Sequence, residues 1–350
     1  MPRTQKALDP AAMYKAAQLY YRQHMSQTTI ATRMHVDRRD VRRLLDEAEK
    51  QGVVRIHLFQ TVESWLEEAV RVRFPKLQRV LIVPGREVVT EAQCDDLFRR
   101  MGLLAADYFE ELYEQHSAGT PLHVGVTGGG RLLEFASAVP IRNRPTVHVL
   151  VTALVGRGRL GEMQSHSEPN VAASILWTHC GSFPGNCEYE TVEPYRTRGS
   201  VQEELRRLEK VPSIREIVEE MDKLDVVFAG FGFLNNPEAT EAWENRITMG
   251  SLLKSVVDPK EFKGAVGDFC YCPFDADGNT NERWHFFLTA GHYSSSPGID
   301  FYKRMVANGK KVVGFGGPYL LPVIKAALKA EIINVLVLDE YTATQIAEGI

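Results

Sequence analysis

The stretch SQTTIATRMHVDRRDVRRLL, residues 26–45, has the spacing of capping and apolar residues that predicts two short helices joined by a tight turn. Ser26 is expected to cap the N-terminus of the first helix, and Val36 is expected to fill the turn. The buried side chains of the first helix are predicted to be Ile30, Ala31 and Met34. This pattern is typical of a helix-turn-helix.

The second predicted helix begins at Asp37, which with Asp40 three residues later resembles a capping box and would place two carboxylates at the positive end of the helix dipole. Its apolar face is predicted to consist of Val41, Leu44, Leu45 and Ala48. Four arginines lie off that face: Arg38, Arg39, Arg42 and Arg43. Arginine can neutralise a phosphate or bind guanine O6 and N7 in a bidentate pair, so these side chains suit a helix in the major groove of DNA. A solvated basic face on an ordinary helical hairpin is the alternative.

The expected DNA contacts are these four arginines together with the start of the first helix, Ser26, Gln27 and Thr28. A preceding helix over residues 11–22 and a strand over residues 53–58, which follows Gly52, would complete a winged helix-turn-helix domain over residues 1–60. Residues 1–58 carry 11 Lys and Arg against 6 Asp and Glu, whereas the whole chain has a net charge of −4. The head is therefore the basic part of the chain, and double-stranded DNA is its expected partner.

The remaining residues, 61–350, are numerous enough to form a second domain with a sizeable core. The chain has no apolar run of about 18 residues, and its start, MPRTQK, lacks the apolar segment of a secretory signal, so we expect a cytoplasmic protein with no membrane partner. The irregular spacing of the cysteines favours buried reduced thiols over a metal site, and no cofactor is expected. The cysteines are Cys94, Cys180, Cys187, Cys270 and Cys272.

Short apolar runs alternate with helical segments in the second domain. The predicted strands are residues 79–83, 122–126, 147–151, 225–229, 265–271, 311–315 and 334–338. Most of these runs are continuous, which is typical of parallel strands covered on both faces. The predicted fold class is therefore α/β, with a Rossmann-like, mainly parallel sheet behind the winged helix-turn-helix. Such sheets bind ligands at the carboxyl ends of their strands.

Glycines gather where several of these strands end. The run 122–126 continues into Thr127-Gly128-Gly129-Gly130-Arg131, which brings backbone amides, a hydroxyl and a guanidinium to one place that suits an anion. This loop matches neither the dinucleotide fingerprint nor the phosphate-binding loop GxxxxGK[ST]. A glycine at the end of one strand could reflect tight packing alone, but glycines at the ends of several strands together predict a pocket. The other glycine-bearing segments at strand ends are residues 152–159, Gly230-Phe231-Gly232, Gly267-Asp268 and Gly316-Gly317.

With these motifs in place, the whole chain resembles the SorC family of bacterial transcription regulators. The motifs in the head are Leu19-Tyr20-Tyr21, Ser26-Gln27, Ile30-Ala31, Arg43-Leu44-Leu45 and residues 49–56. The motifs in the body are residues 124–127, 264–268, 274–278, 316–317 and 333–340. The resemblance implies a sugar-binding domain similar in fold to ribose-5-phosphate isomerase, glucosamine-6-phosphate deaminase and CoA transferases. It also implies a homotetramer in which effector binding alters operator affinity.

The chain departs from the family pattern at the expected pocket. Leu320 stands where relatives that sense phosphorylated sugars carry a lysine, although Arg131 and Arg157 partly compensate for that charge. His166 lies where relatives place polar groups that contact the ligand. The segment 284–300 is longer and more polar than the family pattern, and it is either a ligand-covering loop or a surface insertion. These features favour an unphosphorylated sugar, polyol or sugar acid over a bisphosphate, with a monoanionic ligand as the intermediate case.

We therefore predict a transcription regulator, and not an enzyme, whose affinity for operator DNA is controlled by a small carbohydrate-type effector. The alternative is an enzyme similar to sugar-phosphate isomerases or deaminases with an accessory DNA-binding head. Because the glycine loops offer no convincing pair of carboxylates, no catalytic residue and no metal site are predicted. Asp268 is expected to accept sugar hydroxyls, with loop capping as the alternative. The predicted effector contacts are Thr127, Gly128, Gly129, Gly130, Arg131, Arg157, His166, Gly230, Asp268, Gly316 and Gly317.

Overall fold

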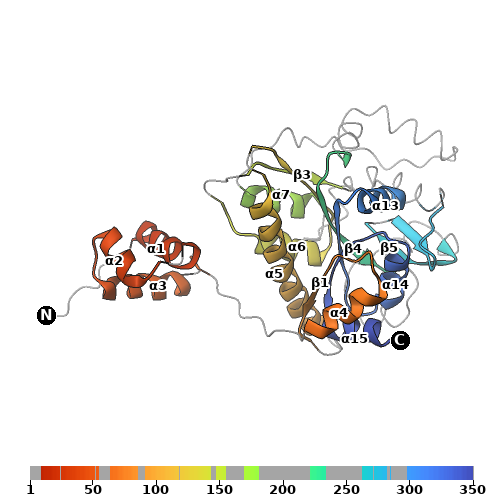
Figure 1. Ribbon diagram of the computed structural model, residues 1–350, viewed down its shortest axis with the longest axis horizontal. Coiled ribbons are helices and arrows are strands. Elements are labelled where there is room, and N and C mark those ends of the chain that lie inside the picture. Colours follow the sequence, from red (N-terminus) through yellow and green to blue (C-terminus); the bar gives the residue numbers. More distant parts are fainter. Residues whose placement is uncertain are drawn as a thin grey trace. The chain divides into compact units, whose positions relative to one another are not determined.

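The chain forms two compact units, Met1–Gln60 and Thr61–Ile350, in the computed structural model (Figure 1). We call them the head and the body. The structure describes residues 9–23, 25–51, 53–54, 64–85, 91–117, 119–142, 147–154, 169–180, 221–233, 262–270, 272–281, 284 and 298–349.

The head is a bundle of short helices around one apolar core. Its helices are α1 (Pro10–Ala17), the π-helical turn η1 (Gln18–Arg22), α2 (Gln27–Met34) and α3 (Arg38–Lys50). The helix predicted over residues 11–22 is present as α1 and η1, because a proline in the first turn and the side chain of Asp9 fix its start. The core that closes the bundle consists of Met13, Ala16, Ala17, Leu19, Ile30, Ala31, Val41, Leu44, Leu45 and Ala48.

The turn between α2 and α3 differs in detail from the prediction. Ser26 caps α2 as expected, since its hydroxyl accepts a hydrogen bond from the amide of Thr29 at 3.1 Å. Val36 does not fill the turn, because its side chain is 36% exposed. The turn is closed by backbone hydrogen bonds instead, with His35 in the left-handed conformation (φ 55°). Asp37 stands at the N-cap of α3, but its side chain makes no capping hydrogen bond, so the predicted capping box is absent.

The body is built on a central sheet in which six parallel strands run in the order β1-β8-β7-β4-β2-β3 (Figure 1). Two further strands are antiparallel, since β5 pairs with the end of β4 and β6 pairs with β5. The strands are β1 (Arg79–Val83), β2 (Leu122–Val126), β3 (Val149–Ala153), β4 (Val226–Gly232), β5 (Ala265–Phe269), β6 (Cys272–Asp275), β7 (Lys311–Phe315) and β8 (Val335–Asp339).

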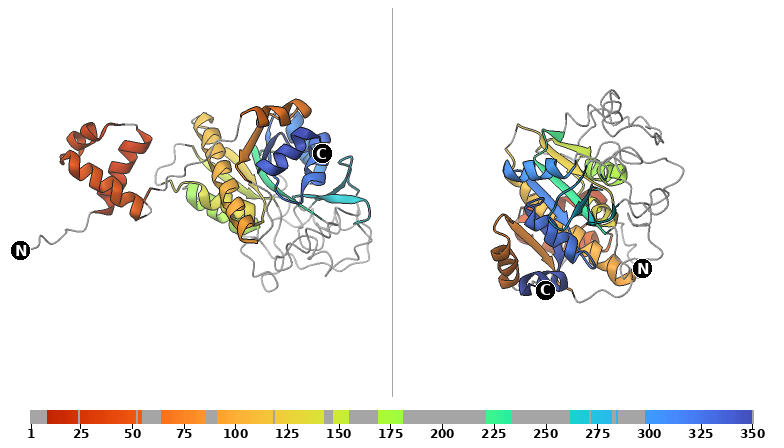
Figure 2. Two further views of the ribbon diagram at one scale, coloured as in Figure 1. Left: turned by 90° about the horizontal axis from the view of Figure 1, so that it is seen from below. Right: turned by 90° about the vertical axis from the view of Figure 1, so that its right-hand side faces the viewer.

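Helices cover both faces of this sheet, as the continuous apolar runs predict (Figure 2). Successive residues of β1 show the arrangement, because Val80 and Ile82 pack into one cluster whereas Leu81 and Val83 pack into the other. The first cluster contains side chains of α4 (Ser64–Arg73), α13 (Ile299–Ala307), α14 (Leu321–Lys329) and α15 (Glu340–Glu348). The second contains side chains of α5 (Glu91–Gln115), α6 (Gly130–Ala138) and α7 (Pro169–Cys180).

Two predicted strands need the larger corrections, while β4 and β8 each begin one residue later than predicted and β4 continues to Gly232. The run 265–271 is not one strand of the parallel sheet, because Cys270 adopts a positive φ of 51° and ends β5, after which β6 turns back along it. The strand predicted over residues 147–151 lies two residues later, at β3. In the head, Val53 and Val54 form a bend, and the rest of the predicted wing lies outside the described residues.

The described cysteines are all buried, and none of these four is in a disulfide: Cys94, Cys180, Cys270 and Cys272. Cys187 lies outside the described residues. Within the described part of the chain, no group of three or more His, Cys, Asp or Glu could hold a metal ion. Across the same residues, no helix combines the length and apolar character needed to span a bilayer.

Candidate effector site and DNA-binding face

The turn from β2 into α6 presents backbone amides at the carboxyl edge of the sheet. Gly129 is the N-cap of α6 and has a φ of 107°, a conformation that side-chain-bearing residues rarely adopt. The carbonyl of Gly129 accepts hydrogen bonds from Leu132 and Leu133, both at 3.0 Å, which fixes the first turn of the helix. The first amides of a helix have no partner within the helix, so this turn can receive a polar or anionic group.

Thr127 connects this turn to the end of β4. Its side chain is buried, with 1% exposed, and its hydroxyl oxygen lies 3.4 Å from the amide nitrogen of Gly230, which donates to it. The amide of Thr127 also donates to the carbonyl of Phe228 at 3.1 Å. Two of the predicted contact residues, Thr127 and Gly230, are therefore in direct contact.

Asp268 reaches the same edge from β5. It is paired in register with Gly232 of β4, and its carboxylate is 3% exposed. A Cβ atom on Gly232 would lie 2.3 Å from Oδ2 of Asp268, so only glycine leaves room for the carboxylate. The hairpin that β5 forms with β6 thus delivers an acidic side chain to the end of β4.

The end of β7 supplies the paired glycines. Gly316 donates its amide to the carbonyl of Val337 at 2.8 Å, and Gly317 has a φ of 140°. Leu320, at the position where the family resemblance leads us to expect a lysine in relatives that sense phosphorylated sugars, is 3% exposed and packs into the apolar cluster beneath α14. The position is therefore part of the core in this chain and brings no charge to the edge.

Arg131 joins three of these segments. Its Nη1 donates to the carbonyl oxygens of Phe315 (3.1 Å) and Gly316 (2.5 Å), and its Nη2 donates to the carbonyl of Phe231 (2.6 Å). The guanidinium carbon lies 5.2 Å from the ring centroid of Phe98 on α5. Burial lowers the pKa of Arg131 to about 10, so the side chain remains charged at neutral pH.

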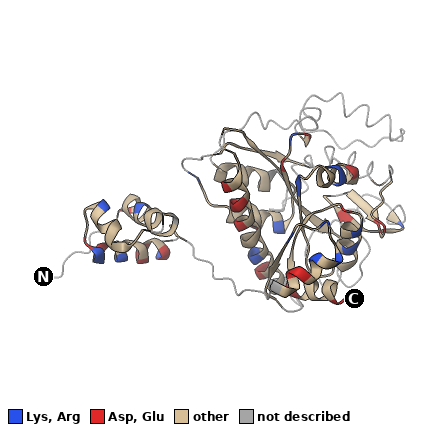
Figure 3. Cartoon of the chain, in the orientation of Figure 1, with Lys and Arg blue, Asp and Glu red and all other residues tan. Residues whose placement is uncertain are grey.

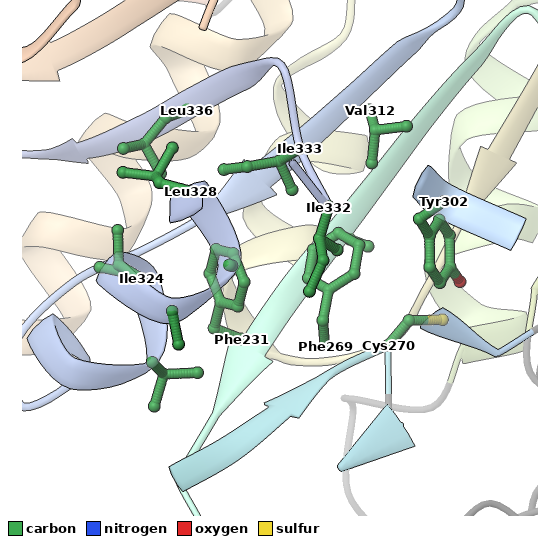
Figure 4. Close-up of a cluster of buried hydrophobic side chains, with 14 of the residues drawn as sticks. Phe231, Phe269, Cys270, Tyr302, Val312, Ile324, Leu328, Ile332, Ile333 and Leu336 are labelled. Atoms are coloured by element: carbon green, nitrogen blue, oxygen red, sulfur yellow. The ribbon is translucent and has the colours of Figure 1, made fainter. Parts of the chain in front are cut away.

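Figure 4 shows part of the buried apolar cluster into which Phe231, near the end of β4, packs. The rings of Phe231 and Phe269 lie 4.8 Å apart, and the rings of Phe269 and Tyr302 lie 4.9 Å apart. Phe231 therefore faces the core with its side chain while its carbonyl accepts a hydrogen bond from Arg131.

The predicted effector residues fall into two groups. The structure gathers nine of them at the ends of β2, β4, β5 and β7: Thr127, Gly128, Gly129, Gly130, Arg131, Gly230, Asp268, Gly316 and Gly317. Arg157 and His166 lie outside the described residues, as does most of the segment 284–300.

Two residues at this edge have roles that the sequence did not indicate. Phe98 packs against Arg131, and a Cβ on Gly130 would touch its ring at 3.6 Å. Gly232 makes room for Asp268. Phe98 belongs to an ordinary apolar stripe of α5, so nothing in the local pattern distinguishes it, and the importance of Gly232 appears only from the antiparallel pairing of β4 with β5.

The predicted DNA-binding residues lie on the surface of the head. All four arginines of α3 are exposed and lie within its first six residues, together with Asp40, whereas three of the four charged side chains that follow are acidic (Figure 3). Arg42 lies 3.9 Å from Asp46, but both side chains are more than half exposed, so this pair is weak. Ser26 and Thr28 are exposed at the start of α2, and Gln27 is partly exposed.

Residues 60–285, about two thirds of the chain, match the family model of the sugar-binding domain, Sugar-bind. The chain belongs to the SorC family of sugar-binding transcriptional regulators. Among curated proteins, the transcriptional regulator LsrR of Escherichia coli K12 is 27% identical over 343 residues, which cover 95% of this chain and 93% of that protein. The sorbitol operon regulator of Klebsiella pneumoniae is 24% identical over 278 residues, 77% of this chain and 79% of that protein.

Solved structures show the same fold. The full-length sorbitol operon regulator SorC of Klebsiella pneumoniae superposes with a TM-score of 0.64 at 19% identity, and the match covers 98% of this chain and all of that one. A DeoR family transcriptional regulator from Listeria monocytogenes superposes with a TM-score of 0.55 at 18% identity, covering 80% of this chain and 98% of that one. A SorC-type architecture, with a helix-turn-helix followed by a mainly parallel α/β domain, is therefore the fold of this chain.

Proposed function

We propose that this SorC family member binds operator DNA through α3 and binds a small carbohydrate-type effector at the carboxyl edge of its sheet, and that the effector changes its affinity for the operator. The observation that supports the effector site is the meeting of four strand ends around the start of α6, connected by Thr127 and Arg131. The exposed arginines of α3 support the DNA-binding role. Operator binding would place the protein in the cytoplasm.

We propose an unphosphorylated sugar, polyol or sugar acid as the effector, ahead of a bisphosphate. Leu320 is buried in the core and brings no charge, and the Nη1 and Nη2 donors of Arg131 are directed to carbonyl oxygens. The hydroxyls of a sugar could be met by the amides of the Gly128–Gly130 turn and by the carboxylate of Asp268. One carboxylate or phosphate could still rest on the helix N-terminus, so a monoanion is the second candidate.

The first experiment is a thermal-shift screen of the full-length protein with sugars, sugar phosphates, sugar acids and polyols, since a ligand that binds the folded state raises its stability. Sorbitol and sorbitol 6-phosphate are the first matched pair, because the Klebsiella relative is named for sorbitol. Compounds that shift the midpoint are then added to the protein bound to a fluorescent operator obtained by binding-site selection. A change in operator affinity supports the proposal, whereas turnover of a sugar phosphate would favour the enzyme alternative.

Calorimetry on matched pairs tests the ligand class. We expect the unphosphorylated member to bind at least as tightly as its phosphate, and Thr127→Val to weaken both because it removes the hydroxyl that receives the amide of Gly230. Tight binding by the phosphorylated member alone would overturn the preferred class. Binding that Thr127→Val leaves unchanged would place the pocket elsewhere.

We also propose that the protein acts as a homo-oligomer, at least a dimer, and as a tetramer on the family resemblance. A single helix-turn-helix reads one short half-site, so useful affinity requires two heads on a two-part operator. Sedimentation of the full-length protein without DNA should show the oligomer, and a monomer at micromolar concentration would contradict the proposal.

A further inference from the structure

Arg131 has the position of an anion-binding residue, but its contacts are those of a structural cross-link. It is the second residue of α6, directly after the glycine turn. Its guanidinium makes three hydrogen bonds to backbone carbonyls, two at the end of β7 and one at the end of β4. A guanidinium has five N–H donors in a fixed fork, so these bonds commit three of the five.

The surroundings of Arg131 fit this arrangement on each side. Phe98 lies under one face of the guanidinium, with 5.2 Å from its ring centroid to the guanidinium carbon. On another side, a Cβ added to Gly317 would lie 3.5 Å from Nη1, in ordinary contact. The side chain is thus held by an aromatic ring from α5 and by the ends of two strands.

The carbonyls that Arg131 contacts belong to the segments that form the proposed pocket. Phe231 lies between Gly230 and Gly232, and Gly316 is the first of the paired glycines. A buried carbonyl that loses its donor is costly, so these segments would rearrange if the guanidinium were removed. Glycine is conformationally permissive, so the contacts with Arg131 add to the other bonds that hold these segments, such as the one from the amide of Gly316 to Val337.

We propose that Arg131 is a positioning residue of the effector pocket, which fixes the ends of β4 and β7 against the first turn of α6 and does not itself bind the effector. The proposal rests on the effector site proposed above. The effector would then be recognised by backbone amides and by side chains such as Asp268, whose places depend on the cross-link.

Hydrogen exchange on the full-length protein tests the cross-link without any ligand. We expect Arg131→Met to raise exchange in peptides that contain Gly230 and Gly316 by about tenfold or more, and Arg131→Lys to raise it less, because an ammonium can still donate to some of the carbonyls. Arg142→Met is the matched control. Arg142 is also buried beside an aromatic ring, 4.0 Å from the centroid of Tyr113, but its carboxylate partner is Glu110 on α5. If Arg131→Met leaves hydrogen exchange at the ends of β4 and β7 unchanged, the proposal is wrong.

Calorimetry with sorbitol and sorbitol 6-phosphate separates positioning from direct contact. If Arg131 positions the pocket, Arg131→Met lowers the affinity for both compounds by a similar factor, and Arg131→Lys partly restores both affinities. If it binds an anionic group, only the phosphate loses affinity, and the proposal is wrong. Should the wild-type protein bind neither compound, the proposed effector class fails on this pair, while the exchange experiment still decides the role of Arg131.

Discussion

Gly232 and Asp268 face each other in the antiparallel pairing of β4 with β5. The aspartate carboxylate occupies the space that a side chain at position 232 would fill. The distance from a Cβ built on Gly232 to Oδ2 of Asp268 would be 2.3 Å, well inside van der Waals contact. The acidic group at the carboxyl edge therefore depends on a glycine 36 positions earlier in the chain.

Gly232→Ala should therefore displace Asp268. We expect a loss of stability of about 1–3 kcal/mol, typical of an added group in a packed site, and weaker binding of any compound that the wild type binds. The control is Gly85→Ala, whose new Cβ would meet Arg100 only at 3.9 Å. Thermal unfolding measures the loss of stability, and calorimetry measures the change in ligand affinity. If Gly232→Ala leaves the ligand affinity unchanged, Asp268 does not belong to the binding site.

The parallel part of the fold was predictable because it depends on local signals. Continuous apolar runs predict the first and last residues of β1, β2 and β7 correctly. Because these strands are buried on both faces, polar residues do not alternate with apolar ones along them, and the run ends where the strand ends. The β5–β6 hairpin was missed because its turn is made at Cys270, a residue type that gives no turn signal. Similarly, apolar character predicts that Val36 fills the turn, but this residue follows the left-handed His35 and is 36% exposed.

The candidate site was predictable in position but not in its internal contacts. Glycines at strand ends indicated where the pocket lies, because parallel strands share one carboxyl edge. The partners of Arg131 could not be predicted, since its acceptors are main-chain carbonyls about 100 and 184 residues away, which any sequence would supply. Asn334 shows the same limit at the opposite edge, where its side chain accepts from Val312 and donates to Lys310.

Arg73 holds the C-terminal helix to the first helix of the body. Its Nε donates to the carbonyl of Ala347 at 2.8 Å, at the negative end of the dipole of α15. We expect Arg73→Ala to lower the free energy of unfolding of the body by about 1 kcal/mol. Arg71→Ala, on the same helix, removes only an exposed pair with Glu68 and should cost at most about 0.5 kcal/mol. Equal losses in denaturant unfolding of the two variants would show that the contact with α15 contributes nothing specific.

Tyr21 should make the head sensitive to alkaline pH. Burial, together with the hydrogen bond that its hydroxyl donates to Glu49 at 2.6 Å, raises the pKa of Tyr21 from 10.0 to about 12. The folded head therefore keeps this proton after the unfolded chain has lost it. The resulting stabilisation is complete below pH 10 and is lost as the pH rises toward 12.

Tyrosinate absorbance measures this shift. Titration of the wild-type chain should show tyrosines that ionise near pH 12, and Tyr21→Phe should reduce that late component. Tyr108→Phe is the comparison variant in the body. Because burial also raises the pKa of Tyr108 to about 12, this variant shows how large a decrease in the late component one such tyrosine produces. A late component of the same size in wild type and Tyr21→Phe would contradict the assignment.

The arginines of α3 should determine which operator the protein selects. Arg39 and Arg42 are exposed near the front of the helix, where one good base contact contributes roughly 1–3 kcal/mol of discrimination. Arg43 adjoins the buried Leu44 and is expected to contact a phosphate, so Arg43→Ala should weaken all sequences alike and reduce the salt dependence of binding. Binding-site selection on Arg39→Ala and Arg42→Ala should relax the preference at particular base pairs. Arg99→Ala, which removes an exposed arginine from the body, is the matched control for charge alone. If both α3 variants select the same operator as the wild type, α3 does not read the bases.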